Sequence, residues 1–306
     1  MNPMFSRILK ALCTLVAVAM LSACGGASST VEPFKPNRVI GLGDAYNDVG
    51  STAGAPFTVR GTNNISTVVE QVAYLFSLGG VGTFVDAATY TALPATGVFS
   101  YAVGGSLIAG GANSLQDQIA AAAADVGGSF ADTDLIIISA GTWDLKNGTD
   151  VRSNYVTLIE SLVDTYKAKH ILVMQPLEIA TTPFGKAAGT YAATAANDFF
   201  DYVKATLQDS ISRKGLNYNP ILFGASGLSS AYNVYSARNP VSLGPFVTSG
   251  SVPYCGNAQD FTGCSPNVGD TTVYDTTLFA DGINLTPAGN RWVGGYLYLV
   301  TGQGWR

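Results

Sequence analysis

The sequence predicts an α/β protein of three layers, with helices covering both faces of a central, mostly parallel β-sheet. Short apolar runs alternate along the chain with longer stretches whose apolar residues recur at helical spacing. A repeated strand–helix–strand order predicts parallel strands in one sheet with helices on its two faces. Such connections are almost always right-handed. No internal repeat interrupts this pattern.

The elements follow from these patterns in chain order. Strands are predicted at residues 38–42, 99–103, 134–139, 170–175 and 220–223. Helices are predicted at residues 66–78, 115–124, 152–166 and 186–213. The first three place apolar residues at i, i+3, i+4 and i+7, and the last is rich in alanine, with one apolar face formed by Phe199, Phe200, Val203 and Leu207. Residues 79–98 and 240–277, rich in Gly, Thr, Pro and Ser, are predicted to form long loops or short hairpins, where substrate contacts are often found.

The first 23 residues have the features of an export signal. Arg7 and Lys10 precede an apolar stretch from Ala11 to Leu21, which is shorter than the roughly 20 residues that a membrane span needs. Residues 21–24 (LSAC) resemble a bacterial lipobox, which predicts an acylated Cys24 at the mature N-terminus. An ordinary signal peptide with an incidental cysteine, or a buried helix, is the alternative.

This interpretation divides the chain into a lipoprotein signal peptide (1–23), a flexible tether rich in Gly and Ser (24–36) and one domain (37–306). The protein is therefore expected to be exported and anchored by lipid in the bacterial cell envelope. Gly25, which is not acidic, favours the outer membrane.

Composition argues against nucleic acid as a partner. Charged residues make up 12 % of the chain, about half the usual share. Without Arg7 and Lys10, 14 basic residues stand against 21 acidic ones, and no cluster of Lys and Arg occurs. The neutral, polar composition is typical of exported proteins.

Two cysteines remain after removal of Cys13 with the signal and acylation of Cys24. Cys255 and Cys264 lie nine positions apart in a stretch rich in Gly, Asn and Pro. In an oxidising compartment we expect them to form a disulfide. The alternatives are two free thiols or a zinc site, and the second is disfavoured because no CxxC spacing occurs and the only histidine, His170, is remote.

Four short motifs occur near predicted strand ends or helix starts. They are residues 43–50 (GDAYNDVG), 101–106 (YAVGGS), 139–144 (SAGTWD) and 279–289 (FADGINLTPAG). In this order they resemble the blocks of the SGNH (GDSL-type) ester hydrolases, whose first block would read GDSLSDxG here. The resemblance implies the SGNH-hydrolase or flavodoxin-like sandwich, with its crevice outside the carboxyl ends of the strands.

The resemblance also indicates which catalytic groups are replaced. Ala45 stands at the nucleophile position, Asn284 at the base position and Trp143 at the position of an oxyanion-binding asparagine. Asp281 remains as the orienting acid, with oxyanion-site glycines at Gly104 and Gly105 and the framework residues Asp44, Tyr46, Asp48, Gly141 and Asp144. Loss of the nucleophile alone typically lowers turnover by about 10⁶. An asparagine amide has no basic lone pair to offer at neutral pH.

Two classes of function follow from this pattern. The leading hypothesis is an inactive binding or scaffolding protein that keeps a cleft for an ester, glycan or lipid, with Trp143 and Tyr46 as aromatic walls. The alternative is an active esterase or lipase that uses a relocated nucleophile, for which Ser51 and Ser139 are the nearest hydroxyls, or a metal-activated water. Neither serine has an obvious base in the sequence.

The acidic residues of the motifs allow one further interpretation. Asp44, Asp144 and Asp281 follow converging strand ends, with Asp48 one turn along, and such carboxylates could hold a hard cation. Hydrogen bonds to backbone N–H groups explain the same residues more simply, so no metal or cofactor is expected. Crowded acids without a cation would have raised pKa values.

Overall fold

Six strands form one parallel sheet, one strand more than the five that the sequence predicts. A computed structural model of the chain describes residues 33–51, 58, 65–85, 92–224 and 278–305. The strand order is β2-β3-β1-β4-β5-β6, and every neighbouring pair is parallel. The strands are β1 (Arg38–Gly43), β2 (Thr83–Phe84), β3 (Gly97–Ser100), β4 (Asp134–Ser139), β5 (Ile171–Met174) and β6 (Ile221–Gly224).

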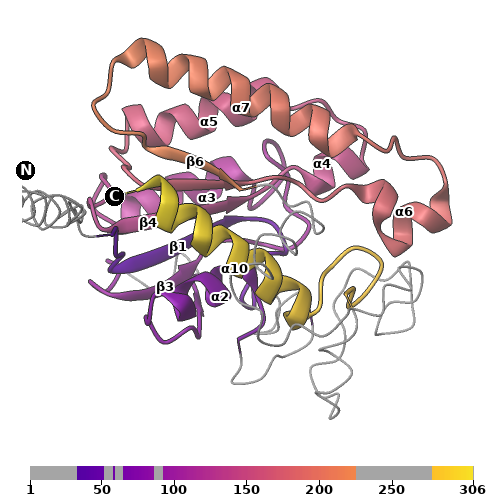
Figure 1. Cartoon of the computed structure of the whole chain (residues 1–306), viewed down its shortest axis with the longest axis horizontal. Helices are drawn as coiled ribbons and strands as arrows, with labels where there is room; N and C mark the ends of the chain where they lie inside the picture. The colour runs from indigo at the N-terminus through magenta and orange to yellow at the C-terminus, as the bar shows by residue number, and fades with distance from the viewer. Residues whose placement is uncertain (1–32, 52–57, 59–64, 86–91, 225–277, 306) are drawn as a thin grey trace, which may run out of the picture. The chain divides into compact units, whose positions relative to one another are not determined.

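Helices cover both faces of this sheet. The described helices are α2 (Val68–Leu75), α3 (Leu115–Asp125), α4 (Thr142–Lys146), α5 (Arg152–Asp164), η2 (Ile179–Thr181), α6 (Pro183–Ala188), α7 (Ala195–Lys214) and α10 (Pro287–Gly304). Figure 1 shows α5 and α7 along one side of the sheet and α2 and α10 along the other. The three-layer α/β prediction is therefore confirmed.

The side chains of β4 show why the sheet needs cover on both faces. Ile136 and Ile138 belong to the core cluster shared with α3, α5 and α7, whereas Leu135 and Ile137 belong to the cluster shared with α2 and α10. Successive residues of a strand point to opposite faces, so an uninterrupted apolar run requires two apolar layers. All four side chains are fully buried.

Helix α10 packs closely against α2 because one glycine lets it approach. A Cβ at Gly294 would lie 2.6 Å from the Cβ of Gln71. The helix begins as the fourth motif predicts, with Pro287 in its first turn and the Thr286 hydroxyl accepting from the Gly289 N–H. Among the helices of the described segments, none is long and apolar enough to cross a membrane.

The sequence-based boundaries differ from the structure in a few places. The helix predicted at residues 186–213 is two helices, because α6 ends at Gly189 in a left-handed conformation (φ 67°) and α7 starts at Ala195. The segment predicted as a loop or hairpin at residues 79–98 contains the short parallel strand β2. Residues 1–32, with Cys24, and residues 225–277, with Cys255 and Cys264, lie outside the described residues.

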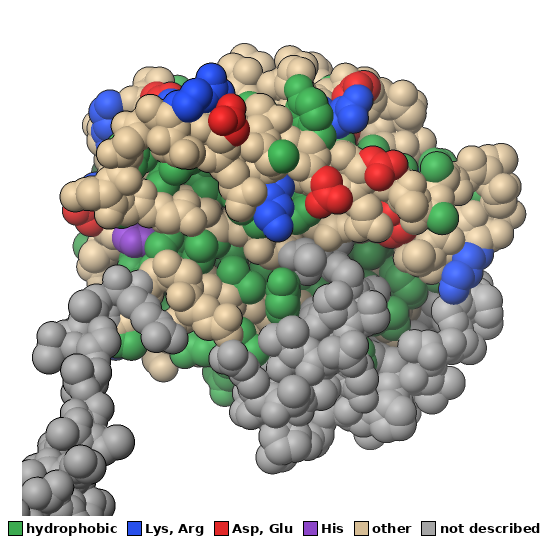
Figure 2. Space-filling view, turned by 45° about the horizontal axis from the view of Figure 1, so that its top comes forward, with side chains coloured by type: hydrophobic (Ala, Val, Ile, Leu, Met, Phe, Trp, Pro, Cys, Tyr) green, Lys and Arg blue, Asp and Glu red, His purple; other side chains and the backbone are tan. Residues whose placement is uncertain are grey.

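Charged side chains are sparse on the surface. Figure 2 shows them scattered over the visible face, with basic and acidic groups interspersed. Several form exposed ion pairs, such as Lys169 with Asp132 at 2.6 Å and Arg213 with Asp209 at 2.9 Å. Such exposed pairs add little stability, typically about 0–1 kcal/mol each.

Candidate functional site

The first motif leaves β1 through a turn that only glycine can make. Gly43 has φ 108°, and a Cβ there would lie 1.8 Å from the backbone oxygen of Ser139. The Gln118 side chain fixes this turn from α3, because its Oε1 accepts from the Gly43 N–H at 2.6 Å and its Nε2 donates to the Gly43 oxygen at 2.9 Å. The Asp44 N–H also donates to the Ser139 oxygen at 2.6 Å. The ends of β1 and β4 are therefore held together.

Asp44 is a buried carboxyl with one oxygen left unpaired. Its Oδ1 accepts from the Ser139 hydroxyl at 3.0 Å and from the Tyr46 N–H at 3.4 Å. Within the described part of the chain, its Oδ2 has no donor of good geometry, but the nearby Thr142 hydroxyl helps to hold the pKa of Asp44 down. Burial raises the pKa of Asp44 from 3.8 to about 7, and the charge of nearby Asp144 adds to this shift.

Asp144 connects the third motif to the segment after the second. Its Oδ2 accepts from the Ile108 N–H at 3.1 Å. Burial raises the pKa of Asp144 from 3.8 to about 6. The expected rise in pKa of Asp44 and Asp144 is therefore present, but its main cause is loss of water around the carboxyls and not crowding of negative charge.

Asp48 serves the backbone of its own turn and of the second motif. Its Oδ1 accepts from the N–H groups of Gly50 at 2.9 Å and Ser51 at 2.7 Å, and its Oδ2 accepts from the Gly104 N–H at 2.7 Å. Gly104, a predicted oxyanion-site glycine, thus has its N–H directed at a carboxylate. The other candidate, Gly105, is exposed and adopts φ 83°.

The fourth motif forms a tight turn around Asp281. Its Oδ1 accepts from the N–H groups of Ile283 at 2.8 Å and Asn284 at 2.7 Å, and its Oδ2 accepts from the Asn284 side-chain amide at 2.8 Å. This last contact orients the amide, so its Oδ1 points away from Asp281. The Oδ1 of Asn284 is buried and accepts from no group in the described segments. The Asn284 amide therefore keeps the contact with the carboxylate that the family's histidine would make.

Tyr46 joins the first motif to the fourth. It lies in the same buried cluster as Phe279, Ile283 and Leu285. Burial raises the pKa of the Tyr46 hydroxyl well above its ordinary value, and the charges of Asp44 and Asp281 raise it further. Among the described residues this hydroxyl has no hydrogen-bond partner. The neighbouring Ala45 is 7 % exposed.

Trp143 lies in the first turn of α4, which starts from Gly141 in a left-handed conformation with φ 103°. A Cβ at Gly141 would approach Pro176 and Phe199 to 3.1 and 3.2 Å. The half-buried indole has the Lys146 ammonium 5.0 Å from its ring centroid. An aromatic and a cation therefore occupy the neighbourhood where the resemblance implies a neutral amide.

The two serines considered as relocated nucleophiles, Ser51 and Ser139, each donate a hydrogen bond to a carboxyl that the sequence did not indicate. Ser51 Oγ donates to Asp48 Oδ2 at 2.5 Å, and Ser139 Oγ donates to Asp44 Oδ1 at 3.0 Å. A carboxyl that the sequence did not reveal therefore lies beside each serine. Ser139 is 1 % exposed inside β4, whereas Ser51 is half-buried.

His170 lies away from these motifs. It immediately precedes β5, at the opposite end of that strand from the carboxyl edge where the motifs gather. Its ring stacks on Phe34, with centroids 3.8 Å apart, and meets Trp305 edge-on at 4.9 Å. Burial lowers its pKa. His170 therefore has a structural role at the end of the strand.

The acidic residues of the motifs do not gather into a metal-binding cluster in the described segments. No group of three or more His, Cys, Asp or Glu side chains there is placed to share an ion. Asp48 and Asp281 direct both of their oxygens at N–H or hydroxyl donors of their own turns and of Gly104. These contacts are the structural role that the sequence favoured over a cation.

Two positioning residues escaped the sequence analysis. Gln118 fixes Gly43, and Asn47 donates from its Nδ2 to the backbone oxygens of Leu42 and Ile137, both at 3.0 Å. For Gln118, the sequence did offer a signal, because a glutamine occupies a position of α3 that packs inward. Asn47 gave none, because polar residues are ordinary in turns.

The fold and the converging motifs define a class of protein, an α/β sandwich whose site is built like that of an ester hydrolase. The sequence model of the GDSL-like Lipase/Acylhydrolase family matches residues 42–297, and the chain belongs to this family. The predicted membership is confirmed.

Solved structures offer a more distant comparison. One described as "a putative arylesterase from Agrobacterium tumefaciens" is similar at 16 % identity, with 86 % of this chain and 97 % of that chain covered and a TM-score of 0.40. No curated protein matches the chain.

Proposed function

We propose that this protein is a catalytically inactive member of the GDSL-like family that binds a ligand or acts as a scaffold in the bacterial cell envelope. Two replaced side chains carry the proposal. Ala45 presents only a methyl group, and Asn284 presents an amide whose Nδ2 lies 2.8 Å from Asp281 Oδ2. The first residue has no atom that can attack a carbonyl, and the second cannot take up a proton near neutral pH.

The oxyanion site is altered as well. The Gly104 N–H donates to Asp48 and the amide expected at position 143 is an indole, so two of the donors that would stabilise a developing oxyanion are engaged or replaced. Each such donor is typically worth about 10²–10³ in turnover. These changes affect nucleophile, base and oxyanion site together, which supports loss of acyl transfer.

The polar atoms left in the site favour a ligand that donates hydrogen bonds. Within the described residues, Asn284 Oδ1 is a buried acceptor without a donor, and the Tyr46 hydroxyl lacks a partner. An unpaired buried polar atom costs about 1–3 kcal/mol. A ligand hydroxyl both donates and accepts, so it could pair with either group, whereas an ester carbonyl only accepts and could not pair with Asn284 Oδ1. This chemistry supports binding of a hydroxyl-bearing ligand.

Hydrolysis assays test the loss of activity. We expect the purified protein to hydrolyse p-nitrophenyl acetate and p-nitrophenyl butyrate no faster than a heat-denatured sample. Turnover above that control, or covalent labelling of a residue in this site by a fluorophosphonate, would overturn the proposal.

A second candidate function, an active ester hydrolase, is favoured by the hydrogen bond between Ser51 and Asp48. That carboxyl also accepts three backbone N–H bonds, which hold it as a structural acceptor. If Ser51 were the nucleophile, fluorophosphonate labelling would occur and would disappear in Ser51→Ala. A metal-activated water would instead give turnover that a chelator abolishes.

The envelope location rests on the N-terminal sequence. We propose that Cys24 is acylated after removal of residues 1–23, and that Cys255 and Cys264 form a disulfide in an oxidising compartment. Palmitate labelling that is lost in Cys24→Ser, with release of the protein from the membrane fraction, is the expected result. Membrane retention and labelling of the variant would contradict it.

A further inference from the structure

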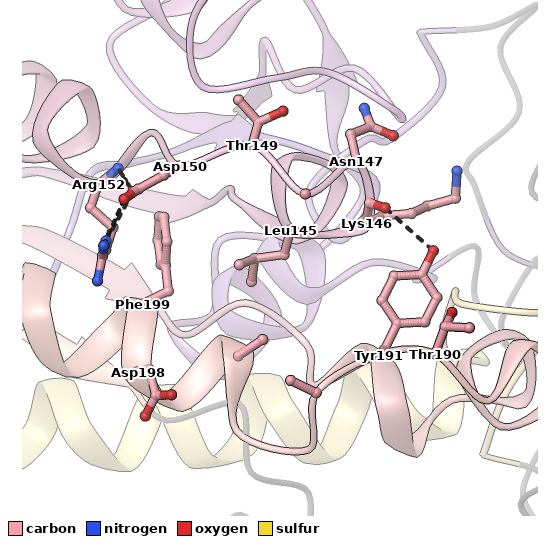
Figure 3. Close-up of a pocket in the computed structure, with 13 residues that line it drawn as sticks. Leu145, Lys146, Asn147, Thr149, Asp150, Arg152, Thr190, Tyr191, Asp198 and Phe199 are labelled. Atoms are coloured by element: carbon pink, nitrogen blue, oxygen red, sulfur yellow. Dashed lines mark hydrogen bonds and ion pairs between the residues drawn. The ribbon is translucent and has the colours of Figure 1, made fainter.

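A cavity of about 630 Å³ lies beside the candidate site, outside the four motifs. Its walls are the end of α4, the first turn of α5, the connection from α6 to α7 and the first turn of α7 (Figure 3). This volume lies within the range of about 300–1,000 Å³ that is usual for small-molecule sites. Because none of its lining residues belongs to the motifs, a ligand here does not depend on the chemistry at Ala45.

The middle of the cavity is apolar and firmly held. Leu145 and Phe199 line it, together with Ala192 and Ala195. Phe199 is 3 % exposed, and its ring stacks on Tyr155 with centroids 5.8 Å apart. The buried Phe199 ring supports this surface from below, and Leu145, Ala192 and Ala195 supply most of the apolar area that a ligand would meet.

Polar groups stand at both ends of this apolar surface. At one end Arg152 makes a two-pronged ion pair with Asp150, at 2.9 and 2.6 Å, and Asp198 lies nearby (Figure 3). At the opposite end the Tyr191 hydroxyl donates to the Lys146 backbone oxygen at 3.3 Å. Carboxylates, a guanidinium and a phenol thus surround an aliphatic and aromatic floor.

The charges around the cavity balance. Lys146 and Arg152 offset Asp150 and Asp198. The cavity also faces the N-termini of α5 and α7, whose positive dipole ends are matched by Asp150, just before α5, and by Asp198 in the first turn of α7. With two basic and two acidic side chains, the cavity selects for neither an anion nor a cation, which suits a neutral ligand.

We propose that this cavity binds a neutral saccharide. A sugar ring presents C–H groups on its faces, which fit the apolar surface of Leu145, Ala192 and Ala195. The hydroxyls around its edge can pair with the carboxylates of Asp150 and Asp198 and with Tyr191. An acyl chain would remove the exposed carboxylates of Asp150 and Asp198 from water and offer them no hydrogen bond in return, which is unfavourable. The inference goes beyond the proposed function and holds whether or not the family site is active.

Calorimetric titration of the purified protein with maltose, cellobiose and N,N′-diacetylchitobiose tests the proposal, with octanoate and inorganic phosphate as contrasting probes. We expect at least one disaccharide to bind, and Tyr191→Ala or Asp198→Asn to weaken that binding about tenfold or more. Two matched controls should bind as the parent does. One is Tyr74→Ala, at a tyrosine that is 53 % exposed and lies outside the cavity, and the other is Asp201→Asn, one turn further along α7.

Thermal unfolding of each variant separates lost binding from lost folding. If Tyr191→Ala has a lower unfolding temperature than the parent, the test rests on the binding of Asp198→Asn. Asp198 is exposed, so its substitution leaves the apolar surface of the cavity intact. The proposal is overturned if no disaccharide binds, if binding is insensitive to Asp198→Asn, or if octanoate or phosphate binds in a way that depends on Tyr191 and Asp198. None of these results bears on the hydrolysis assays.

Discussion

The amide of Asn284 illustrates how one side chain can keep the geometry of a site while lacking its chemistry. Asp281 accepts hydrogen bonds from both the backbone N–H and the side-chain amide of Asn284. A histidine at this position could make the same side-chain contact through one ring nitrogen and keep the other as a base. An asparagine has only a weakly acidic amide and a carbonyl oxygen. The turn around Asp281 is therefore ready for a base that the sequence does not supply.

Restoring both groups should restore chemistry. We predict that Ala45→Ser together with Asn284→His gains hydrolysis of p-nitrophenyl butyrate, on the order of 10³-fold above the parent and still short of a complete site, because the oxyanion donors remain altered. Each single substitution should stay near background, since nucleophile and base act as a unit. Steady-state kinetics of the four proteins measures this.

A double variant that folds yet shows no gain would mean that Trp143 or the engaged Gly104 N–H blocks the site. The triple variant that adds Trp143→Asn then decides between these two. If the triple variant is also inactive, Trp143 is excluded and the engaged Gly104 N–H accounts for the lack of activity.

Asp44 gives a residue-scale prediction about pH. Its pKa rises from 3.8 to about 7 on folding, so between these values the native state holds a proton that the unfolded state has released. Stability therefore falls as pH rises through this window, with a slope of about 1.4 kcal/mol per pH unit from this group, and levels off above it. Asp44→Asn should remove that contribution.

Urea unfolding of the parent and of Asp44→Asn between about pH 4 and pH 7 measures the difference in slope. Asp150→Asn is the control, because Asp150 is exposed and its pKa is lowered by Arg152. Parallel curves for parent and Asp44→Asn would show that Asp44 is ionised throughout.

At the scale of elements, α3 holds the end of β1 through a single side chain. The Gln118 amide pairs with both backbone groups of Gly43, an interior contact between residues 75 positions apart. We predict that Gln118→Met, which keeps the approximate volume, lowers the free energy of unfolding by about 1–3 kcal/mol, because the buried Gly43 N–H loses its acceptor, while the Gly43 oxygen keeps the Val103 N–H and the Ser106 hydroxyl as donors.

Chemical denaturation measures this loss, with Gln116→Met as the control on the exposed side of the same helix. The control should unfold within about 0.5 kcal/mol of the parent. Equal effects of the two substitutions would mean that the contact with Gly43 does not stabilise the turn.

The helix elements also show where sequence patterns succeed. The starts predicted at Leu115 and Arg152 agree with α3 and α5, and α3 is capped by Ser114 and Asp117, which accept from each other's N–H groups. The long predicted helix at 186–213 failed because alanine-rich sequence favours helix on both sides of Gly189, where a left-handed residue ends α6. Local propensity alone does not locate such a break.

At the scale of the whole molecule, the two ends of the sheet have different roles. The carboxyl ends of the strands carry the motifs, while the other end holds a shielded ion pair. Arg38 of β1 contacts Asp134 of β4 through two nitrogens, at 2.7 and 2.6 Å, with the Asp134 side chain 1 % exposed. We predict that Asp134→Asn costs about 3–5 kcal/mol of stability, because it leaves the guanidinium without its counter-charge.

The matched control is Asp209→Asn, which removes the exposed partner of Arg213 and should cost under about 1 kcal/mol. Ligand binding by folded Asp134→Asn, measured by calorimetry, should be unchanged. A stability loss that does not exceed that of Asp209→Asn would contradict this role for the ion pair.

The sequence by itself determined the fold class, the family and the identity of the replaced groups. Apolar runs that need cover on both faces specify the layered sheet, and the presence of a methyl group at Ala45 is a covalent fact that no folding changes. Short local patterns were sufficient for these conclusions.

Only the tertiary structure decided which donor meets which acceptor. The Gly104 N–H directed at Asp48, the carboxyls beside Ser51 and Ser139, and the cavity between α4 and α7 all depend on contacts between segments or within turns whose side-chain directions the sequence leaves open. Hydrogen bonds depend on distances of a few tenths of an ångström and on direction, and these are set by how whole elements pack and not by local periodicity.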